Sequence, residues 1–220
     1  MRISLPPEKL EAYVASLLRH HFPDGYEPDR TLGPLVASAL EKVEYCFGHI
    51  HRKYYHDGTD VLFDHLNGDH FASFLYFLAN TAWRNSASVE LPSRLFYLNK
   101  VMHGIDLFYS VTMPEVFMLV HPLGTVLGHA HYGNHLVVYQ NVTVGADEAG
   151  IYPRFGDGTV LYSKSSVIGE CLFGDDVVVG ANAFVLNTDV PGGSLVVGQY
   201  PAHHIKPTAG SVAMRVFHTS

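Results

Sequence analysis

The stretch FGDGTVLYSKSSVIGECLFGDDVVVGANAFV, residues 155–185, decides the fold of this chain. Every sixth residue is large and apolar, which selects Phe155, Leu161, Val167, Phe173, Val179 and Val185. This period predicts a β-solenoid with three flat faces, in which each hexad supplies one face and about eighteen residues complete a coil. A β-sandwich of short strands would instead alternate at every second residue, with turns every eight to twelve or so.

The same period continues upstream of this stretch. The earlier core-facing positions are predicted to be Val120, Val126, Tyr132, Val138 and Val144. Only eleven residues separate Val144 from Phe155, where twelve would keep step, so we expect an irregular loop within residues 145–156 that leaves the prism and lines a binding face. A glycine follows several apolar positions and is expected to turn a corner where a Cβ would be strained: Gly133, Gly145, Gly156, Gly174 and Gly180.

The first half of the chain has a helical period instead. Apolar residues recur at helical spacing over 8–22, 31–55, 70–83 and 92–104, with Gly104 after the last of these segments. The sequence therefore predicts an α+β chain with three parts: a helical domain over 1–104, a β-helix domain over 105–207 and a C-terminal tail over 208–220.

The composition limits the classes of partner that the chain can bind. The chain carries 14 Lys and Arg against 21 Asp and Glu, with no basic run, which argues against nucleic acid. Two distant cysteines give neither a disulfide framework nor a cysteine zinc site, and no segment resembles a signal peptide or is apolar for long enough to span a bilayer. We expect a cytoplasmic protein that binds small molecules and is not inserted in a membrane.

Four ordered motifs resemble the serine acetyltransferases, a family of hexapeptide-repeat acyltransferases with a helical N-terminal domain and a left-handed parallel β-helix. The motifs are GIDLFYSVTMPEVFMLVHPLG (104–124), LVVYQNVTVG (136–145), GIYPRFGDG (150–158) and NTDVPGGSLVVGQYPAHHIKP (187–207). The resemblance covers residues 90 to 207. It implies an acetyl-CoA-dependent O-acetyltransferase that acts by direct transfer, without a covalent enzyme intermediate.

The resemblance assigns His121 as the general base and Asp106, fifteen residues earlier, as the carboxylate that orients it. A hydroxyl is a weak nucleophile at neutral pH and must lose its proton as it attacks the thioester. An imidazole suits this task, and a carboxylate fixes its tautomer and stabilises the imidazolium. The competing interpretation of His121 is a packing or surface histidine.

The acceptor pocket departs from the family pattern. Val120 stands where the family has an aspartate, and Ile151 and Tyr152 stand where it has Arg-His. Those family residues hold the amino group and the carboxylate of L-serine, so the acceptor is predicted to be either L-serine or a sugar hydroxyl. Tyr152 would stack on a sugar or, alternatively, close the hydrophobic floor.

In the family, CoA lies in the groove between two prisms of a trimer. By matching positions, its contacts are expected at Gly145, Ala146, Ser163, Ala181 and Lys206, although each of the four small residues also fits a corner kept small for the backbone alone. A homotrimer or a dimer of trimers is therefore expected.

The segment HAHYGNH, residues 129–135, invites a zinc interpretation. Spacings of two and four put its histidines on different corners of a six-residue repeat, so no metal is expected. The alternatives that remain are an O-acetyltransferase specific for sugars or polysaccharides, and a non-catalytic or zinc-dependent hexapeptide-repeat protein.

Overall fold

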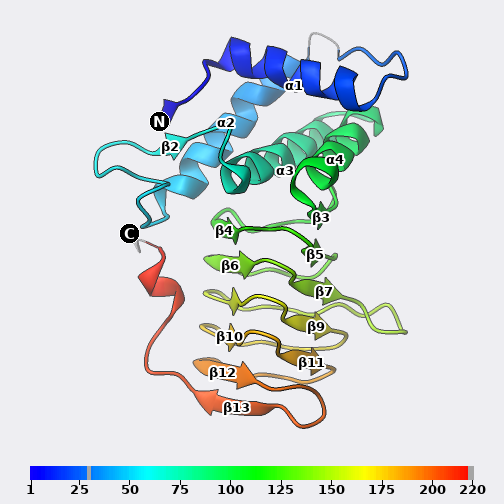
Figure 1. The fold of residues 1–220 in the computed structure, drawn as a ribbon. Coiled ribbons are helices and arrows are strands. Elements are labelled where there is room, and N and C mark those ends of the chain that lie inside the picture. The colour runs from blue at the N-terminus through cyan, green and yellow to red at the C-terminus, as the bar shows by residue number, and fades with distance from the viewer. Residues whose placement is uncertain (29–30, 218–220) are drawn as a thin grey trace.

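The computed structural model describes residues 1–28 and 31–217 of the 220-residue chain. A helical half sits on one end of a parallel β-solenoid, as Figure 1 shows. The helices are α1 (Pro7–His21), α2 (Leu32–Gly48), α3 (Gly68–Asn85) and α4 (Glu90–His103). A short parallel pair, β1 (Arg2–Ile3) and β2 (Leu62–Phe63), lies beside them. All four predicted helical segments are confirmed, and within the described residues no helix is long and apolar enough to cross a membrane.

Helix α3 is the centre of the helical half. Every residue from 70 to 82 is buried, because α2 and α4 pack against this helix and it also contacts the start of the solenoid. Its N-terminus is capped by Asn67, whose side-chain oxygen accepts from the backbone N–H of Asp69 at 3.0 Å. At the other end of the domain, α4 stops at Gly104, which adopts the left-handed conformation with φ 65°.

Two parallel sheets and one line of bridges form the three faces of the solenoid. The first sheet stacks one strand from each coil and ends with an antiparallel strand: β4 (Phe117–Val120), β6 (Leu136–Tyr139), β8 (Val160–Leu161), β10 (Val178–Val179), β12 (Ser194–Val197) and β13 (His204–Pro207). The second sheet stacks β3 (Asp106–Leu107), β5 (Val126–Leu127), β7 (Thr143–Gly145), β9 (Ser166–Ile168) and β11 (Phe184–Leu186). The third face is held by single parallel bridges, such as His131 to Arg154 and Phe173 to Val190. The predicted solenoid is confirmed.

The positions predicted to face the core are wrong by one residue in the first coil. Leu119, and not Val120, pairs in register with the core residue Val138, and Leu127, and not Val126, pairs with Val144. Val120 is half-buried and Val126 is 41% exposed. The reason is a longer corner: Leu119 and Leu127 are eight positions apart where Val138 and Val144 are six apart. The two extra positions fall around His121.

The role of the repeat glycines also differs from the prediction. Gly156 and Gly174 stack on the third face, where a Cβ on Gly156 would lie 2.6 Å from the carbonyl carbon of Gly174. These glycines are needed because successive coils approach closely there, and neither has a positive φ. The corners between the two sheets are turned by non-glycine residues in the left-handed region: His121, Asn141, Lys164 and Asn182, with φ from 49° to 61°.

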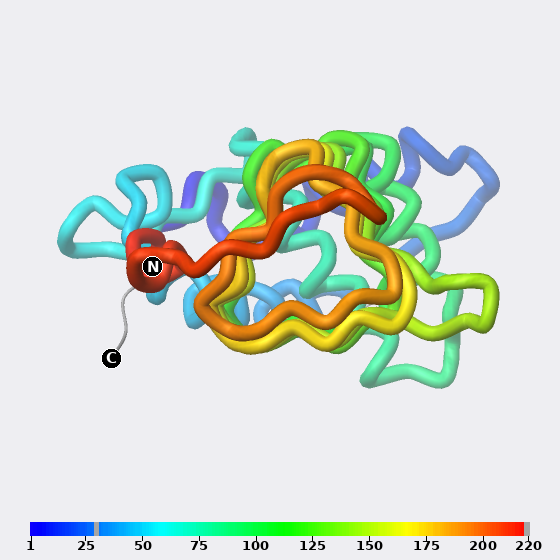
Figure 2. The backbone as a smooth tube through the Cα atoms, turned by 90° about the horizontal axis from the view of Figure 1, so that it is seen from below, coloured from blue at the N-terminus to red at the C-terminus, as the bar shows by residue number. Residues whose placement is uncertain are grey.

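The chain leaves the prism at one loop and returns to the helices at its end. The predicted loop is confirmed over residues 146–153 and projects from the stacked coils in Figure 2. After β13 the tail runs back along the solenoid, where Phe217 bridges to Ile50 and the Val216 carbonyl accepts from the His51 N–H at 2.6 Å. Residues 218–220 of the predicted tail lie outside the described residues.

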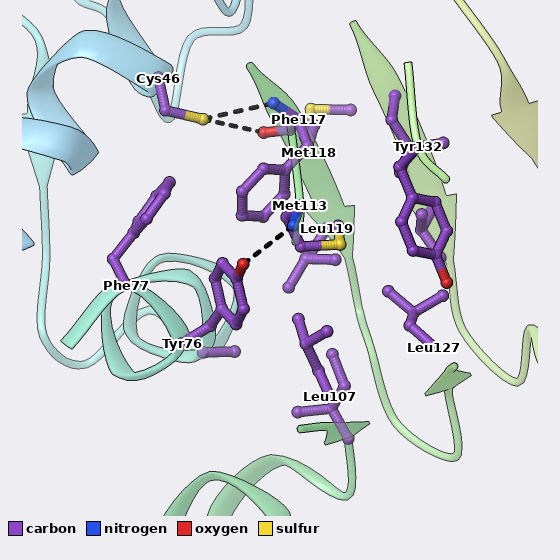
Figure 3. Close-up of a cluster of buried hydrophobic side chains, with 14 of the residues drawn as sticks. Cys46, Tyr76, Phe77, Leu107, Met113, Phe117, Met118, Leu119, Leu127 and Tyr132 are labelled. Atoms are coloured by element: carbon purple, nitrogen blue, oxygen red, sulfur yellow. Dashed lines mark hydrogen bonds between the residues drawn. The ribbon is translucent and has the colours of Figure 1, made fainter. Parts of the chain in front are cut away.

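A shared apolar core joins the two halves (Figure 3). The Cys46 thiol donates to the carbonyl of Phe117 at 3.1 Å, and the Tyr76 hydroxyl accepts from the Met113 N–H at 3.0 Å. Tyr76 and Phe77 of α3 also contact the Phe117 ring. The helical half is therefore fixed against the first coil, at the coil that carries His121.

Candidate active site

His121 lies at the first corner of the solenoid, directly after β4. Its backbone is in the left-handed region, with φ 49°, and its side chain is 74% exposed. Asn141, Lys164 and Asn182 at the equivalent corners share this conformation, which is uncommon for non-glycine residues. A cavity of about 700 Å³ opens beside it, lined by residues from both halves of the chain: Tyr54, Asp64, Leu66, Asn67, Gly68, Asp69, Met102, His103, His121, Pro122 and Leu123.

Asp69, in the first turn of α3, is the carboxylate that meets His121. Its Oδ1 accepts from the His121 backbone N–H at 2.9 Å and lies 3.9 Å from the His121 Nδ1. Burial raises the pKa of the Asp69 carboxyl, against the opposing effects of the His121 N–H and imidazole. The side chain of Asp69 is only 20% exposed, and the Asn67 cap fixes the turn that carries it. Asp69 thus holds the His121 backbone and lies close to its ring.

Asp106, the predicted partner of His121, lies on the strand stacked next to β5, where it pairs with Val126. It begins β3, and its Oδ2 forms an ion pair with the Lys100 Nζ at 2.6 Å. Among residues 1–28 and 31–217, no hydrogen bond or ion pair joins Asp106 to His121. The structure therefore does not join the side chains of the two predicted catalytic residues.

The three predicted acceptor residues are not gathered around His121. Val120 precedes it on β4 and pairs with Tyr139, while the other two lie on the projecting loop at another corner. The Tyr152 ring packs over Gly128, where a Cβ would come within 2.5 Å of it, and contacts His129 at 6.3 Å between ring centroids. Ile151 is 42% exposed, and its N–H donates to the Asp147 carboxylate at 3.0 Å.

The predicted CoA contacts divide between two corners and the end strand. Ser163 follows β8 and Ala181 follows β10. Both lie at the corner between the first and second sheets, as His121 does in the first coil. Gly145 and Ala146 lie at the opposite end of the second sheet, where the loop begins. Lys206 is exposed on β13 and pairs with Leu195.

The three histidines of HAHYGNH are separated by the fold. The His129 Nε2 lies 2.8 Å from the Ser110 Oγ, His131 is exposed and bridged to Arg154, and the His135 ring contacts Phe217. In the part of the chain that the structure describes, no three His, Cys, Asp or Glu side chains are grouped to hold a metal ion.

Sequence reasoning missed the contribution of the helical half to this site. Asp69 and His103 both line the cavity, 52 and 18 positions before His121. Burial lowers the pKa of His103 to about 4, and its Nδ1 lies 2.8 Å from the Asn99 Oδ1. The one available signal was the sequence Asn-Gly-Asp at the start of a helix, which predicts a cap but says nothing about what the aspartate faces.

Comparisons with known proteins agree with this architecture. No family model matches the chain. The serine acetyltransferase of Helicobacter pylori is 32% identical over 108 residues, which is 47% of this chain and 63% of the relative. Serine acetyltransferase 2 of Arabidopsis thaliana is 31% identical over 149 residues, 64% of this chain and 44% of the relative. The chain thus spans about half of the length of these curated relatives.

Solved structures match over nearly the whole chain. The serine acetyltransferase of Brucella abortus superimposes with a TM-score of 0.71 at 17% identity, covering 94% of this chain and 85% of that one. That of Neisseria gonorrhoeae in complex with serine has a TM-score of 0.66 at 23% identity, covering 90% and 83%. A serine acetyltransferase in complex with CoA has a TM-score of 0.66 at 17% identity, covering 91% and 84%.

A helical domain seated on a parallel solenoid of six-residue repeats defines the class of hexapeptide-repeat proteins. Within that class, the chain is similar in sequence to serine acetyltransferases, which are acyltransferases, and it shares their fold.

Proposed function

We propose that this protein is an acetyl-CoA-dependent O-acetyltransferase with His121 as its general base. The observation that carries the proposal is the exposed His121 imidazole on a left-handed corner, beside a cavity of about 700 Å³ and within 3.9 Å of a half-buried carboxylate. An exposed base at the edge of a cavity can reach a small hydroxyl compound. The kinship with serine acetyltransferases supports acetyl-CoA as the donor.

The reaction follows from the base and its carboxylate. The imidazole takes the proton of the acceptor hydroxyl while the oxygen attacks the thioester carbonyl carbon. The tetrahedral intermediate then collapses, the carbon–sulfur bond breaks, and the proton passes to the leaving CoA sulfur. Asp69 stabilises the imidazolium that exists between these two proton transfers. Asp106, the carboxylate that the family resemblance assigns, is the rival candidate for this role.

The donor is proposed to lie along the second sheet of the solenoid. Ser163 and Ala181 lie at one end of this sheet, and Gly145 and Ala146 lie at the other. Small residues at these points let a pantetheine chain approach the backbone. Lys206 would meet the phosphates. We further propose that the chain works in the cytoplasm as a homotrimer or a dimer of trimers, in which a neighbouring prism completes the donor groove.

Replacing His121 by Ala tests the proposal. Release of free thiol from acetyl-CoA, measured with L-serine and with simple sugars as acceptors, is expected to fall about a hundredfold or more, the usual contribution of a general base. His20→Ala, which removes an exposed histidine on α1, is the matched control and retains full activity. Unchanged thiol release in His121→Ala, or none from the wild type with any hydroxyl acceptor, would refute the assignment.

A further inference from the structure

The cavity beside His121 has an apolar rim that its exposed side chains leave open to solvent. Leu66 is 76% exposed, Tyr54 is 63% exposed and Leu123 is 61% exposed, and all three line it. Large apolar side chains gathered at one cavity and left uncovered indicate a surface that an apolar ligand face covers. Free L-serine has one methylene group and offers no such face.

The charged groups of the cavity have one sign. Asp64 and Asp69 line it, and its lining contains no lysine or arginine. Lys100, in the last turn of α4, forms an ion pair with Asp106 at 2.6 Å. The Lys53 ammonium lies over the Tyr54 ring, 4.8 Å from its centre. A carboxylate placed next to His121 would therefore meet two carboxylates and no lysine or arginine among the lining residues.

The same polar groups suit hydroxyl groups. An ionised carboxylate accepts hydrogen bonds and cannot donate them, whereas a hydroxyl group can donate one. The Asp64 carboxylate is 54% exposed and has one oxygen that already accepts from the Leu66 N–H at 3.0 Å, which fixes its direction. Acceptor oxygens beside aromatic and aliphatic side chains match a sugar ring, which presents hydroxyl groups at its edge and C–H groups on its face.

We propose that the acceptor is an uncharged sugar hydroxyl and not the hydroxyl of L-serine. The proposal rests on the acetyl-transfer function given above and names its substrate class. The ring would lie against Tyr54 and Leu66, with hydroxyl groups toward Asp64 and with the acetylated hydroxyl toward His121.

The test compares acceptors that differ in one group. Serinol keeps the hydroxyl and the amine of L-serine but replaces its carboxylate by a hydroxymethyl group. Initial rates of thiol release are measured for L-serine, serinol and the methyl glycosides of glucose, galactose, mannose and N-acetylglucosamine. We expect serinol to equal or exceed L-serine in kcat/KM, and at least one glycoside to exceed both by tenfold or more.

A charge variant makes the comparison independent of the sugar chosen. Leu66→Arg adds a guanidinium at the exposed rim and is expected to raise kcat/KM for L-serine at least fivefold relative to serinol. Val89→Arg, at another exposed apolar position, is the matched control and leaves this ratio unchanged.

The outcomes separate the two proposals. If wild type prefers L-serine over serinol by a hundredfold or more and depends on His121, the sugar assignment is overturned while the acetyltransferase function stands. The sugar assignment also falls if no glycoside raises thiol release above that of L-serine. If no acceptor raises it and His121→Ala behaves as wild type, the acetyltransferase function itself is refuted.

Discussion

At the scale of single residues, the site depends on which carboxylate serves His121. Asp69 lies on α3, outside the solenoid repeat. Its Oδ1 nevertheless accepts a hydrogen bond from the His121 N–H at 2.9 Å and lies 3.9 Å from the His121 Nδ1. Asp106 stands at the position that the family resemblance assigns to this carboxylate, but it forms an ion pair with Lys100. The Asp69 carboxylate is 20% exposed and bound to the His121 backbone, whereas that of Asp106 is 35% exposed and paired with Lys100, so Asp69 is better placed to support the imidazole.

Asp69→Asn tests this difference. The asparagine oxygen still accepts from the His121 N–H but carries no charge, so we expect kcat to fall about tenfold or more with little change in the KM for acetyl-CoA. Asp106→Asn is the comparison and is expected to change kcat less than about threefold. Melting curves of both variants check that each is folded, and the opposite order of the two effects would assign the role to Asp106.

At the scale of elements, the solenoid depends on close stacking of its coils more than on turn conformation. Gly156 and Gly174 on the third face do not have a positive φ. The left-handed corners are instead occupied by residues such as Asn141 and Asn182. Asparagine tolerates this region better than most residues, which explains how the corners form without glycine. The first corner is longer by two residues and holds His121, so the irregular element of the repeat carries the proposed general base.

Gly156→Ala tests the stacking argument. The added methyl group would lie 2.6 Å from the carbonyl carbon of Gly174, so the coils must separate, and we expect a loss of about 2 kcal/mol in the free energy of unfolding. Gly48→Ala, at the end of α2 with its nearest neighbour at 3.6 Å, is the control and is expected to be neutral. Denaturant melts measure both, and equal stability of the two variants would contradict the stacking role.

At the scale of the whole molecule, the helices, the first coil and the tail form one body. The tail returns from the last coil to α2, and His70 lies in the helical core among Phe47, Tyr55 and Phe63. His70 is 1% exposed, its Nδ1 accepts from the Asp64 N–H at 3.2 Å, and its Nε2 has no partner among the described residues. Burial lowers the pKa of His70 to about 4.

This buried histidine predicts a loss of stability in acid. Between an unfolded pKa near 6.5 and the folded value of about 4, the unfolded chain binds a proton that the folded chain does not. Stability contributed by neutral His70 is therefore fully present above about pH 6.5 and is lost as the pH falls toward 4, by about 3 kcal/mol. Urea melts at pH 7 and pH 5 measure the change. His70→Gln should make this dependence less steep, with the remainder contributed by His103, whose pKa is also lowered to about 4, and an equally steep dependence would contradict the assignment.

The sequence by itself determined the solenoid, its later coils, the helical half and the projecting loop, because a six-residue apolar period and helical spacing are local patterns that packing reinforces. It also singled out His121. Only the tertiary structure decided the core phase of the first coil, where the period alone cannot show that two extra residues lengthen the corner. It likewise brought Asp69 from the helical half to His121 and Lys100 to Asp106. Contacts between residues of different elements depend on how those elements dock, and residue spacing carries no record of that.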